Sequence, residues 1–256
     1  MEPAGRDGSV IRAILFDLDG TLVQTETLKA ISYARAAVEL RPKDVNEGVV
    51  VESFKEVVGL SRHEVALALM ERFGLEDAAR RRMEELGVNS PWQAFVQLRL
   101  RTYEAMLADP KILLAHQCPY NTALLQWARR TGYRTGLATM SYCAQATRVL
   151  EILGLRNEFD FVATREDVEN GKPDPEIYRL VALELDIPPD ECLVIEDSPS
   201  GVKAALAAGM WCIVVTSVFT HGAIHASGLL DKHWIVDDPA KLQAVVHRMV
   251  RDREKN

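Results

Sequence analysis

From residue 121 onward, short apolar runs alternate with stretches that have helical periodicity, and this alternation is the strongest constraint on the fold. The apolar runs are Tyr133–Ala138, Phe159–Ala163, Cys192–Ile195, Trp211–Val215 and Trp234–Val236. The helical stretches are Asn121–Arg130, Tyr142–Leu153, Pro175–Leu185 and Ser200–Ala208. Strands that alternate with helices form βαβ units, which build a parallel sheet covered by helices. The sequence therefore predicts a doubly wound, Rossmann-like α/β fold.

An earlier apolar run, Val10–Phe16, is typical of one more buried parallel strand. Residues 26–108 break the alternation, because they contain helical runs and no convincing strand. These runs are Thr27–Leu40, Val49–Val58, Arg62–Phe73, Glu76–Leu86 and Pro91–Ala108. The sequence predicts a core domain made of residues 1–25 and 109–256. An all-helical domain, residues 26–108, is inserted between the first strand and the rest of the sheet.

Two aspartates, Asp17 and Asp19, directly follow the first apolar run. Side chains two residues apart on an extended chain point the same way, so the two carboxylates are expected to lie close together. Such a pair tends to keep a proton on one member unless a divalent cation binds there. It can then supply a nucleophile and an acid/base group. Asp-x-Asp-Gly is also a turn signature, so the pair alone leaves both interpretations open.

Two further strand ends carry a hydroxyl and an amine. Thr139 follows the second run, and backbone amides at the start of a helix come after it, an arrangement that binds phosphate oxygens. The alternative is that Thr139 caps the helix. Lys172 follows the third run in a loop braced by glycine and proline, where its ammonium suits a phosphoryl oxygen, although a solvent lysine is the alternative. Asp174 and Pro175 fit the N-cap and first position of the next helix.

Two consecutive carboxylates, Glu196 and Asp197, end the fourth run, where burial without a partner is unfavourable. The alternative is that Asp197 or Ser198 caps the following helix. Ligands of an open parallel sheet bind at the carboxyl ends of its strands, so residues at these four strand ends are expected to meet at one edge. Their coincidence favours one active site over four unrelated caps and turns.

The composition argues against several classes of protein. A net charge of -7 disfavours a nucleic-acid binder, which would carry a basic patch. No window reaches the roughly 18 apolar residues of a membrane span, and Met1–Ser9 carries no apolar segment typical of a secretion signal. The four cysteines lack CxxC spacing, so no zinc or disulfide framework is predicted. We expect a cytoplasmic monomer or homodimer that binds neither nucleic acid nor a membrane.

Four segments match the motifs of a known family: FDLDGTLV at 16–23, LATMS at 137–141, GKPDPEIY at 171–178 and VIEDSPSGVKAALAAGM at 194–210. On these segments the chain resembles the haloacid dehalogenase superfamily, in the branch that includes β-phosphoglucomutase and phosphoglycolate phosphatase. Residues 26–108 are similar in position and type to the small helical cap of that branch. The combined match is specific for the superfamily and the branch, and it does not name a substrate.

The resemblance implies a role for each core residue. Asp17 would attack phosphorus and become an aspartyl phosphate. Asp19 would protonate the leaving oxygen and then deprotonate the water that hydrolyses this intermediate. Thr139 and Lys172 would hold and neutralise the transferred phosphoryl group.

Mg²⁺ is the cofactor that the resemblance implies. Its ligands would be Asp17, the backbone carbonyl of Asp19 and Asp197, with Glu196 as a further ligand or as a partner of the ligands. An oxygen-only set of this kind suits Mg²⁺ chemically.

Substrate binding is assigned to Leu18, Met140 and Ser141 in the core and to Arg62 in the cap. Arg62 lies in the segment GLSRHE at 59–64, which resembles the cap loop that faces the substrate in sugar-phosphate relatives. There it could bind a second anionic group. Ser61 and Glu64 in the same segment also fit a capping box, and both interpretations are compatible.

Two departures from the family pattern favour hydrolysis over mutase chemistry. Gln24 stands where an aspartate is frequent, and Lys29 stands where mutase-like relatives tend to carry a histidine. The first hypothesis is a Mg²⁺-dependent phosphatase that acts on a small phosphorylated metabolite such as a sugar phosphate. A sugar-phosphate mutase is the alternative. A non-enzymatic metabolite-binding protein is disfavoured, because the catalytic carboxylates and the lysine are all present.

Overall fold

The computed structural model describes residues 10–58 and 60–254, and the chain divides into two compact units. One unit takes in the chain up to Gln24 and again from Leu113 onward, and we call it the core unit. The other, the cap unit, is Thr25–Ile112. The N-terminal segment Met1–Ser9 and Gly59 of the GLSRHE segment lie outside the described residues.

The core unit is built on a parallel sheet, and the described residues contribute six strands to it in the order β3-β2-β1-β4-β5-β6. The strands are β1 (Ala13–Phe16), β2 (Arg134–Ala138), β3 (Phe161–Ala163), β4 (Cys192–Glu196), β5 (Trp211–Val215) and β6 (Ile235–Val236). Leu15 of β1 stands opposite Gly136 of β2 and Val194 of β4. The chain fills one side of β1 first and the other side afterwards, so β1 and β4 lie at the topological switch point. The crevice outside their carboxyl ends is where such sheets bind ligands.

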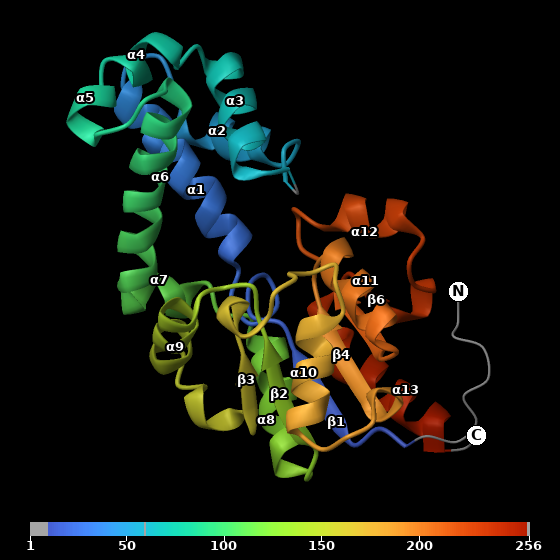
Figure 1. Cartoon of the computed structure of the whole chain (residues 1–256). Coiled ribbons are helices and arrows are strands. Elements are labelled where there is room, and N and C mark those ends of the chain that lie inside the picture. The colour runs from blue at the N-terminus through green and yellow to red at the C-terminus, as the bar shows by residue number, and fades with distance from the viewer. Residues whose placement is uncertain (1–9, 59, 255–256) are drawn as a thin grey trace. The chain divides into compact units, whose positions relative to one another are not determined.

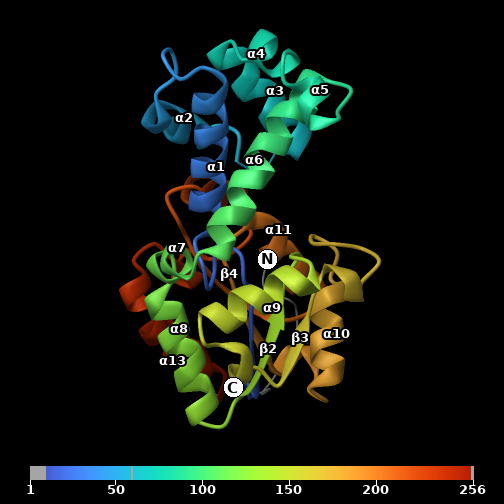
Figure 2. The same cartoon turned by 90° about the vertical axis from the view of Figure 1, so that its left-hand side faces the viewer.

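Helices cover both faces of this sheet, which confirms the predicted doubly wound fold (Figures 1 and 2). The helices of the core unit are α8 (Pro119–Arg130), α9 (Cys143–Ile152), α10 (Glu176–Glu184), α11 (Pro199–Ala208), α12 (His221–Ser227) and α13 (Leu242–Glu254). On one face, apolar side chains of α10 and α11 pack on Leu15, Val194 and Val214. Helices α8 and α13 contact each other, and α8 packs on β2. The sheet is buried on both faces, as its continuous apolar runs predict.

The start of α10 differs from the sequence prediction. The N-cap of α10 is Pro175, and Asp174 instead accepts a hydrogen bond from the N–H of Glu176 at 2.9 Å. The predicted N-cap and first position are therefore one residue too early. Short 3₁₀ turns join several elements: Arg156–Glu158, Arg165–Asp167, Pro189–Glu191, Lys232–Trp234 and Pro239–Lys241.

Among the described residues of the cap unit, helices joined by turns and loops are the regular elements. Its helices are α1 (Thr25–Leu40), α2 (Glu47–Phe54), α3 (Arg62–Phe73), α4 (Glu76–Arg80), α5 (Met83–Leu86) and α6 (Pro91–Ala108), and α7 (Pro110–Ala115) leads back to the core unit. Helix α1 packs on α2 and α6, where Tyr33 lies 5.6 Å from the rings of both Phe54 and Phe95. Ser61 and Glu64 form the predicted capping box of α3.

The predicted single helix Glu76–Leu86 is wrong, because the structure divides it into α4 and α5. The break falls at Arg82, whose guanidinium forms ion pairs with Glu85 at 2.6 Å and with Glu39 of α1 at 3.2 Å. The second pair joins residues that are distant in sequence. Periodicity within one segment therefore gives no sign of it.

The two chain connections between the units run side by side within the core unit. The N–H of Gln24 donates to the carbonyl oxygen of His116 at 2.8 Å, and the N–H of Cys118 donates to that of Leu22 at 2.9 Å. Between them, Val23 and Gln117 form an antiparallel bridge. The outgoing and returning chains are therefore fastened together where the cap unit begins and ends.

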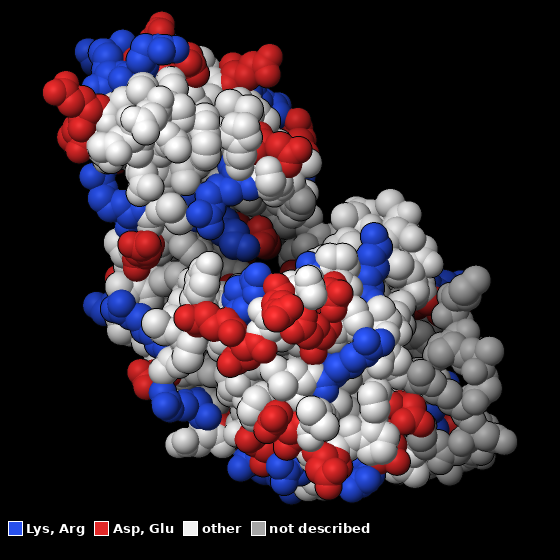
Figure 3. All heavy atoms as spheres, in the orientation of Figure 1, with Lys and Arg blue, Asp and Glu red and all other residues white. Residues whose placement is uncertain are grey.

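The surface charge and the hydropathy of the described helices agree with what the composition predicts. In the view of Figure 3, acidic and basic side chains are interspersed over the core unit, with several groups of acidic side chains among them. Within the described part of the chain, no helix combines the length and the apolar character that a membrane crossing requires.

Candidate active site

Asp17 is the first residue after β1, and its side chain is buried. Its backbone N–H donates to the carbonyl oxygen of Ile195 on β4 at 3.1 Å. The sheet therefore still holds the backbone of Asp17 at the point where its carboxylate reaches the crevice. This position is the carboxyl end of β1, at the topological switch point.

The chain turns directly after Asp17. The N–H of Leu22 donates to the carbonyl oxygen of Leu18 at 2.9 Å, and Gly20 has a φ of +93°. A Cβ at Gly20 would overlap the carboxylate of Asp197, which approaches the backbone closely here. The segment is thus both a turn and the wall of a carboxylate cluster, so the two interpretations of Asp-x-Asp-Gly do not exclude each other.

Lys172 joins the ends of three strands. Its side chain is only 5% exposed, and Nζ donates to Oδ1 of Asp17 at 2.7 Å, to Oε1 of Glu196 at 2.6 Å and to the carbonyl oxygen of Ala138 at 3.0 Å. An ammonium group has three hydrogens, so these bonds use all of them. The ring of Tyr178 lies 4.8 Å from Nζ. Lys172 is therefore held in one position rather than exposed to solvent.

Glu196, the last residue of β4, accepts hydrogen bonds on both carboxylate oxygens. Oε1 accepts from Lys172 and from the hydroxyl of Tyr178 at 2.8 Å. Oε2 accepts from the N–H groups of Asp197 and Ser198 at 3.0 and 3.2 Å, and from Oγ of Ser198 at 3.1 Å. These bonds fix Glu196 as an ionised group that positions its neighbours. Ser198 is also the N-cap of α11, as one of the two alternatives expects.

Asp19 is bound to residues that follow β2. Its Oδ2 accepts from Oγ of Ser141 at 2.6 Å and from Oγ1 of Thr139 at 3.1 Å. The N-cap of α9 is Tyr142, so the alternative role of Thr139 as a helix cap is wrong. The N–H of Ser141 donates to Oγ1 of Thr139 at 3.0 Å. The N–H of Ser141 is therefore already hydrogen-bonded within the turn that follows β2.

Burial and nearby charges shift the pKa values of the buried groups around Lys172 in different directions. Burial raises the pKa of Asp17 from 3.8 to about 7, against the opposing charge of Lys172, and the charges of Glu196 and Asp19 act in the same direction as burial. Burial also acts to raise the pKa of Glu196, but the charge and hydrogen bond of Lys172 outweigh it and hold this pKa below its usual value. Burial acts to lower the pKa of Lys172, and Asp17 and Glu196 raise it above its usual range. Glu196 therefore keeps its charge at neutral pH, whereas Asp17 takes up a proton as the pH falls below about 7.

The carboxylates fit a divalent metal ion. Oxygens of Asp17, Glu196 and Asp197 lie within 4.8 Å of one another, and all three residues are buried. Together with Lys172 they leave two uncompensated negative charges when ionised, which is unfavourable at this depth. A hard divalent cation would balance those charges and would take oxygen ligands of this kind. Glu196 already accepts five hydrogen bonds from the protein, so it is better placed to orient its neighbours than to bind the ion directly.

The remaining predicted binding residues are placed differently. Leu18 is 1% exposed, so its side chain belongs to the core. Met140 is partly buried against the same apolar cluster as α10. Arg62 is the first residue of α3 in the cap unit and is exposed. Assignment of these residues to substrate binding stays a prediction.

Two site residues were missed by the sequence analysis although their segments were identified. Tyr178 donates to Glu196, and a Cβ at Gly201 would overlap that same carboxylate. Tyr178 belongs to the GKPDPEIY segment and lies on the buried face of α10, where a polar aromatic residue needs a partner. Gly201 belongs to the VIEDSPSGV segment, where its lack of a side chain allows the approach of Glu196.

The cap unit contains a group of cations that sequence reasoning found only in part. Arg99 of α6 is 5% exposed, and its guanidinium lies 5.0 Å from the ring of Tyr33 and 4.4 Å from that of Tyr103. Its Nε has no hydrogen-bond partner among the described residues. Burial raises the pKa of Tyr33, and the charges of Arg99, Arg62 and Lys29 oppose this rise. An arginine between Phe95 and Tyr103, at a spacing of four residues on an apolar face, was the available signal.

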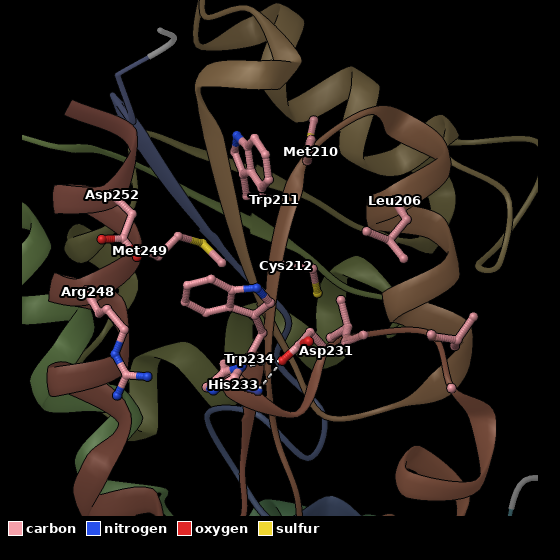
Figure 4. A pocket seen from close by; sticks show the side chains of 13 residues that line it. Leu206, Met210, Trp211, Cys212, Asp231, His233, Trp234, Arg248, Met249 and Asp252 are labelled. Carbon is pink, nitrogen blue, oxygen red and sulfur yellow. Dashed lines mark hydrogen bonds and ion pairs between the residues drawn. The ribbon is translucent and has the colours of Figure 1, made fainter. Parts of the chain in front are cut away.

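A cavity elsewhere in the core unit is separate from these residues. It has a volume of about 730 Å³ and lies at the start of β5, between α13 and the segment before β6 (Figure 4). Among the described residues, Trp211, Trp234 and Arg248 are part of its lining, and the predicted site residues are not. Strand β5 begins at the amino edge of the sheet, opposite to the edge that carries Asp17.

Comparison with known proteins agrees with this geometry. Residues 11–209 match the haloacid dehalogenase-like hydrolase family. The chain belongs to this family. The match covers more than three quarters of the chain, and it includes three of the four segments that suggested the family and all but the last residue of the fourth. The prediction of an enzyme of the hydrolase class is confirmed.

Individual relatives belong to the predicted branch. A phosphorylated carbohydrates phosphatase of Thermotoga maritima is 30% identical over 244 residues, which are 95% of this chain and 96% of the relative. β-Phosphoglucomutase of Bacillus subtilis is 26% identical over 210 residues, 80% of this chain and 83% of the relative. The crystal structure of CbbY from Rhodobacter sphaeroides in complex with phosphate has a TM-score of 0.60 and 25% identity, and covers 91% of this chain and 96% of that one.

Proposed function

We propose that the protein is a metal-dependent phosphatase of a small phosphorylated metabolite, with Asp17 as the nucleophile. The observation that carries this proposal is the position of Asp17. Its buried carboxylate lies at the end of β1, bound to Lys172 at 2.7 Å and within a cluster of carboxylates suited to a divalent cation. Mg²⁺ is the proposed ion, because all the candidate ligand atoms are oxygens.

The residues of the chain would divide the work as follows. When bound, the metal ion would neutralise charge and favour the ionised form of Asp17, whose carboxylate then attacks phosphorus. Lys172 would contact a phosphoryl oxygen, because its Nζ already lies beside the attacking carboxylate. Asp19 would donate a proton to the leaving oxygen and take one from the hydrolytic water. The hydroxyls of Ser141 and Thr139 hold Asp19 in place for this role.

The substrate we propose is a phosphorylated carbohydrate with a second anionic group. The Thermotoga maritima relative is named for phosphorylated carbohydrates. In the cap unit, Arg99 is buried without an ion pair among the described residues, and its charge, like those of Arg62 and Lys29, opposes the rise in the pKa of Tyr33. A buried guanidinium of this kind is stabilised when an anion binds to it.

Mutase activity is the second candidate, because a named β-phosphoglucomutase is among the relatives. Lys29 argues against it. The side chain of Lys29 forms an ion pair with Glu26 at 2.5 Å on α1, where mutase-like relatives tend to carry a histidine. A cytoplasmic location and a monomeric or homodimeric state stay predictions.

A panel of phosphorylated metabolites with Mg²⁺, scored for released phosphate, tests the proposal. We expect hydrolysis of at least one sugar phosphate and of p-nitrophenyl phosphate, and loss of essentially all turnover in Asp17→Asn. Asp174→Asn is the matched control, because its carboxylate lies outside the cluster and, among the described residues, accepts its hydrogen bond from a helix N–H. Turnover of wild-type magnitude by Asp17→Asn would overturn the mechanism. Faster formation of a hexose 6-phosphate from the 1-phosphate and a bisphosphate primer than of free phosphate would identify a mutase instead.

A further inference from the structure

A second group of possible metal ligands lies on the surface of the core unit. His221 and His225 are four residues apart on α12, so they share one face of that helix. Asp237 directly follows β6 and faces both histidines. The ligand atoms of these three residues all lie within 4.8 Å of one another. The cluster therefore joins a helix to the end of a strand.

The distances within this group suit a shared metal ion better than hydrogen bonding alone. Nε2 of His225 lies 3.0 and 3.1 Å from the two oxygens of Asp237, whereas Nε2 of His221 lies 3.7 Å from Oδ1, too far for a hydrogen bond. Metal–ligand bonds of about 2.1 Å separate neighbouring ligand atoms by about 3.0 Å in an octahedron and about 3.4 Å in a tetrahedron. The observed separations bracket these values. His221 thus lies within reach of the same carboxylate without a hydrogen bond to it, and its ring packs on that of His225 with the ring centroids 4.4 Å apart.

The surroundings of Asp237 match those of a metal ligand. Oγ1 of Thr216, a buried residue directly after β5, donates to Oδ1 of Asp237 at 2.8 Å. A hydrogen bond of this kind orients a ligating carboxylate. The neighbouring Asp238 is engaged elsewhere, because its side chain accepts from the N–H of Ala240. The protein therefore offers three ligands and leaves further positions to water.

We propose that His221, His225 and Asp237 form a surface site for a divalent transition metal, with Zn²⁺ as the best match. Two imidazole nitrogens and one carboxylate suit Zn²⁺, Ni²⁺ or Cu²⁺, whereas the oxygen cluster around Asp17 suits Mg²⁺. The two sites therefore select different metals within one unit. Because Thr216 and Asp237 follow β5 and β6, a bound ion ties α12 to this edge of the sheet. The proposal does not depend on the phosphatase function.

Direct binding of Zn²⁺ to the full, metal-free chain tests the proposal. Excess Mg²⁺ is kept present throughout, so that the oxygen cluster is occupied. We expect one equivalent of Zn²⁺ to bind the wild type in equilibrium dialysis. His221→Gln, His225→Gln and Asp237→Asn are each expected to weaken this affinity at least about tenfold, since even partners of metal ligands are worth that much. Zn²⁺ should raise the melting temperature of the wild type and raise it less in these variants.

His233→Gln is the matched control. His233 is an exposed histidine in contact with a carboxylate, Asp231, at 2.5 Å, and among the described residues the pair has no third ligand (Figure 4). This variant should bind Zn²⁺ as the wild type does. With Co²⁺, paramagnetically shifted imidazole protons should appear in the wild type and in His233→Gln and disappear in the other three variants. Absence of Zn²⁺ binding in the wild type, or equal binding by all variants, would overturn the proposal.

Discussion

Lys172 of the core unit and Arg99 of the cap unit are both buried cations, and they differ in how their charges are compensated. Lys172 of the core unit bonds to two carboxylates, and their charges raise its pKa. Arg99 of the cap unit lies against two tyrosine rings without an ion pair among the described residues, and burial lowers its pKa. A buried charge needs a partner. The core unit supplies this partner from its own chain, whereas the described residues of the cap unit supply no carboxylate partner to Arg99.

The largest effect is expected when the compensated cation is removed. Lys172→Met leaves Asp17 and Glu196 buried without their cation, so the free energy of unfolding should fall by about 3–5 kcal/mol. Phosphate release should also fall by about 10²–10³-fold, because a charge near the transferred group is lost. Chemical denaturation in EDTA and steady-state assays measure the two effects. A loss of stability below about 1 kcal/mol would show that the carboxylates do not depend on Lys172.

A double-mutant cycle sharpens this result. Adding Glu196→Gln to Lys172→Met removes the negative charge that the first change leaves unpaired. The double variant should therefore be more stable than the sum of the two single effects implies, by about 0.5–3 kcal/mol. Additive effects in the same denaturation experiment would mean that the two side chains, 2.6 Å apart, do not interact energetically.

Removal of the uncompensated cation should have a smaller and different effect. Arg99→Met should leave stability almost unchanged but raise KM roughly 10- to 100-fold for a substrate with a second anionic group, since a hydrogen bond to a charged group is worth about 1.5–3 kcal/mol. The KM for p-nitrophenyl phosphate should not change. Arg101→Met is the control, because Arg101 lies on the same helix and pairs with Glu39 at the surface. Equal changes in KM for both substrates would refute this anion-binding role.

The smallest effect concerns pH. Because burial raises the pKa of Asp17 to about 7, this carboxyl must lose a proton before it can bind a metal ion. The affinity for Mn²⁺, measured by electron paramagnetic resonance, should therefore be about tenfold weaker at pH 6 than at pH 8. In the absence of metal, the raised pKa favours the folded state at low pH, and this contribution is lost as pH rises through about 7. Asp17→Asn should show neither dependence, and a pH-dependent affinity that persists in this variant would assign the proton to another group.

The sequence was sufficient where the determining contacts lie within one element. Apolar runs identified each strand of the sheet, and the order of residues at the strand ends placed Asp17, Thr139, Lys172 and Glu196 at one edge. Prediction from the sequence failed where contacts join elements that are far apart in the chain. The pair Arg82–Glu39 lies at the break in a helix that periodicity predicts as continuous, and the bond from Tyr178 to Glu196 links α10 to β4. In neither contact do the residues adjacent in the chain indicate which distant residue will be the partner.

The antiparallel bridge between Val23 and Gln117 makes the cap unit exchangeable. Both ends of the inserted segment are anchored by hydrogen bonds that belong to the core unit, so the length and content of the insertion are free to vary while the sheet is preserved. A gene encoding another helical segment could be grafted at this point without altering the residues that follow β1, β2 and β4. Exchange of the segment at this point would therefore change the cap residues and leave the carboxylate cluster of the core unit in place.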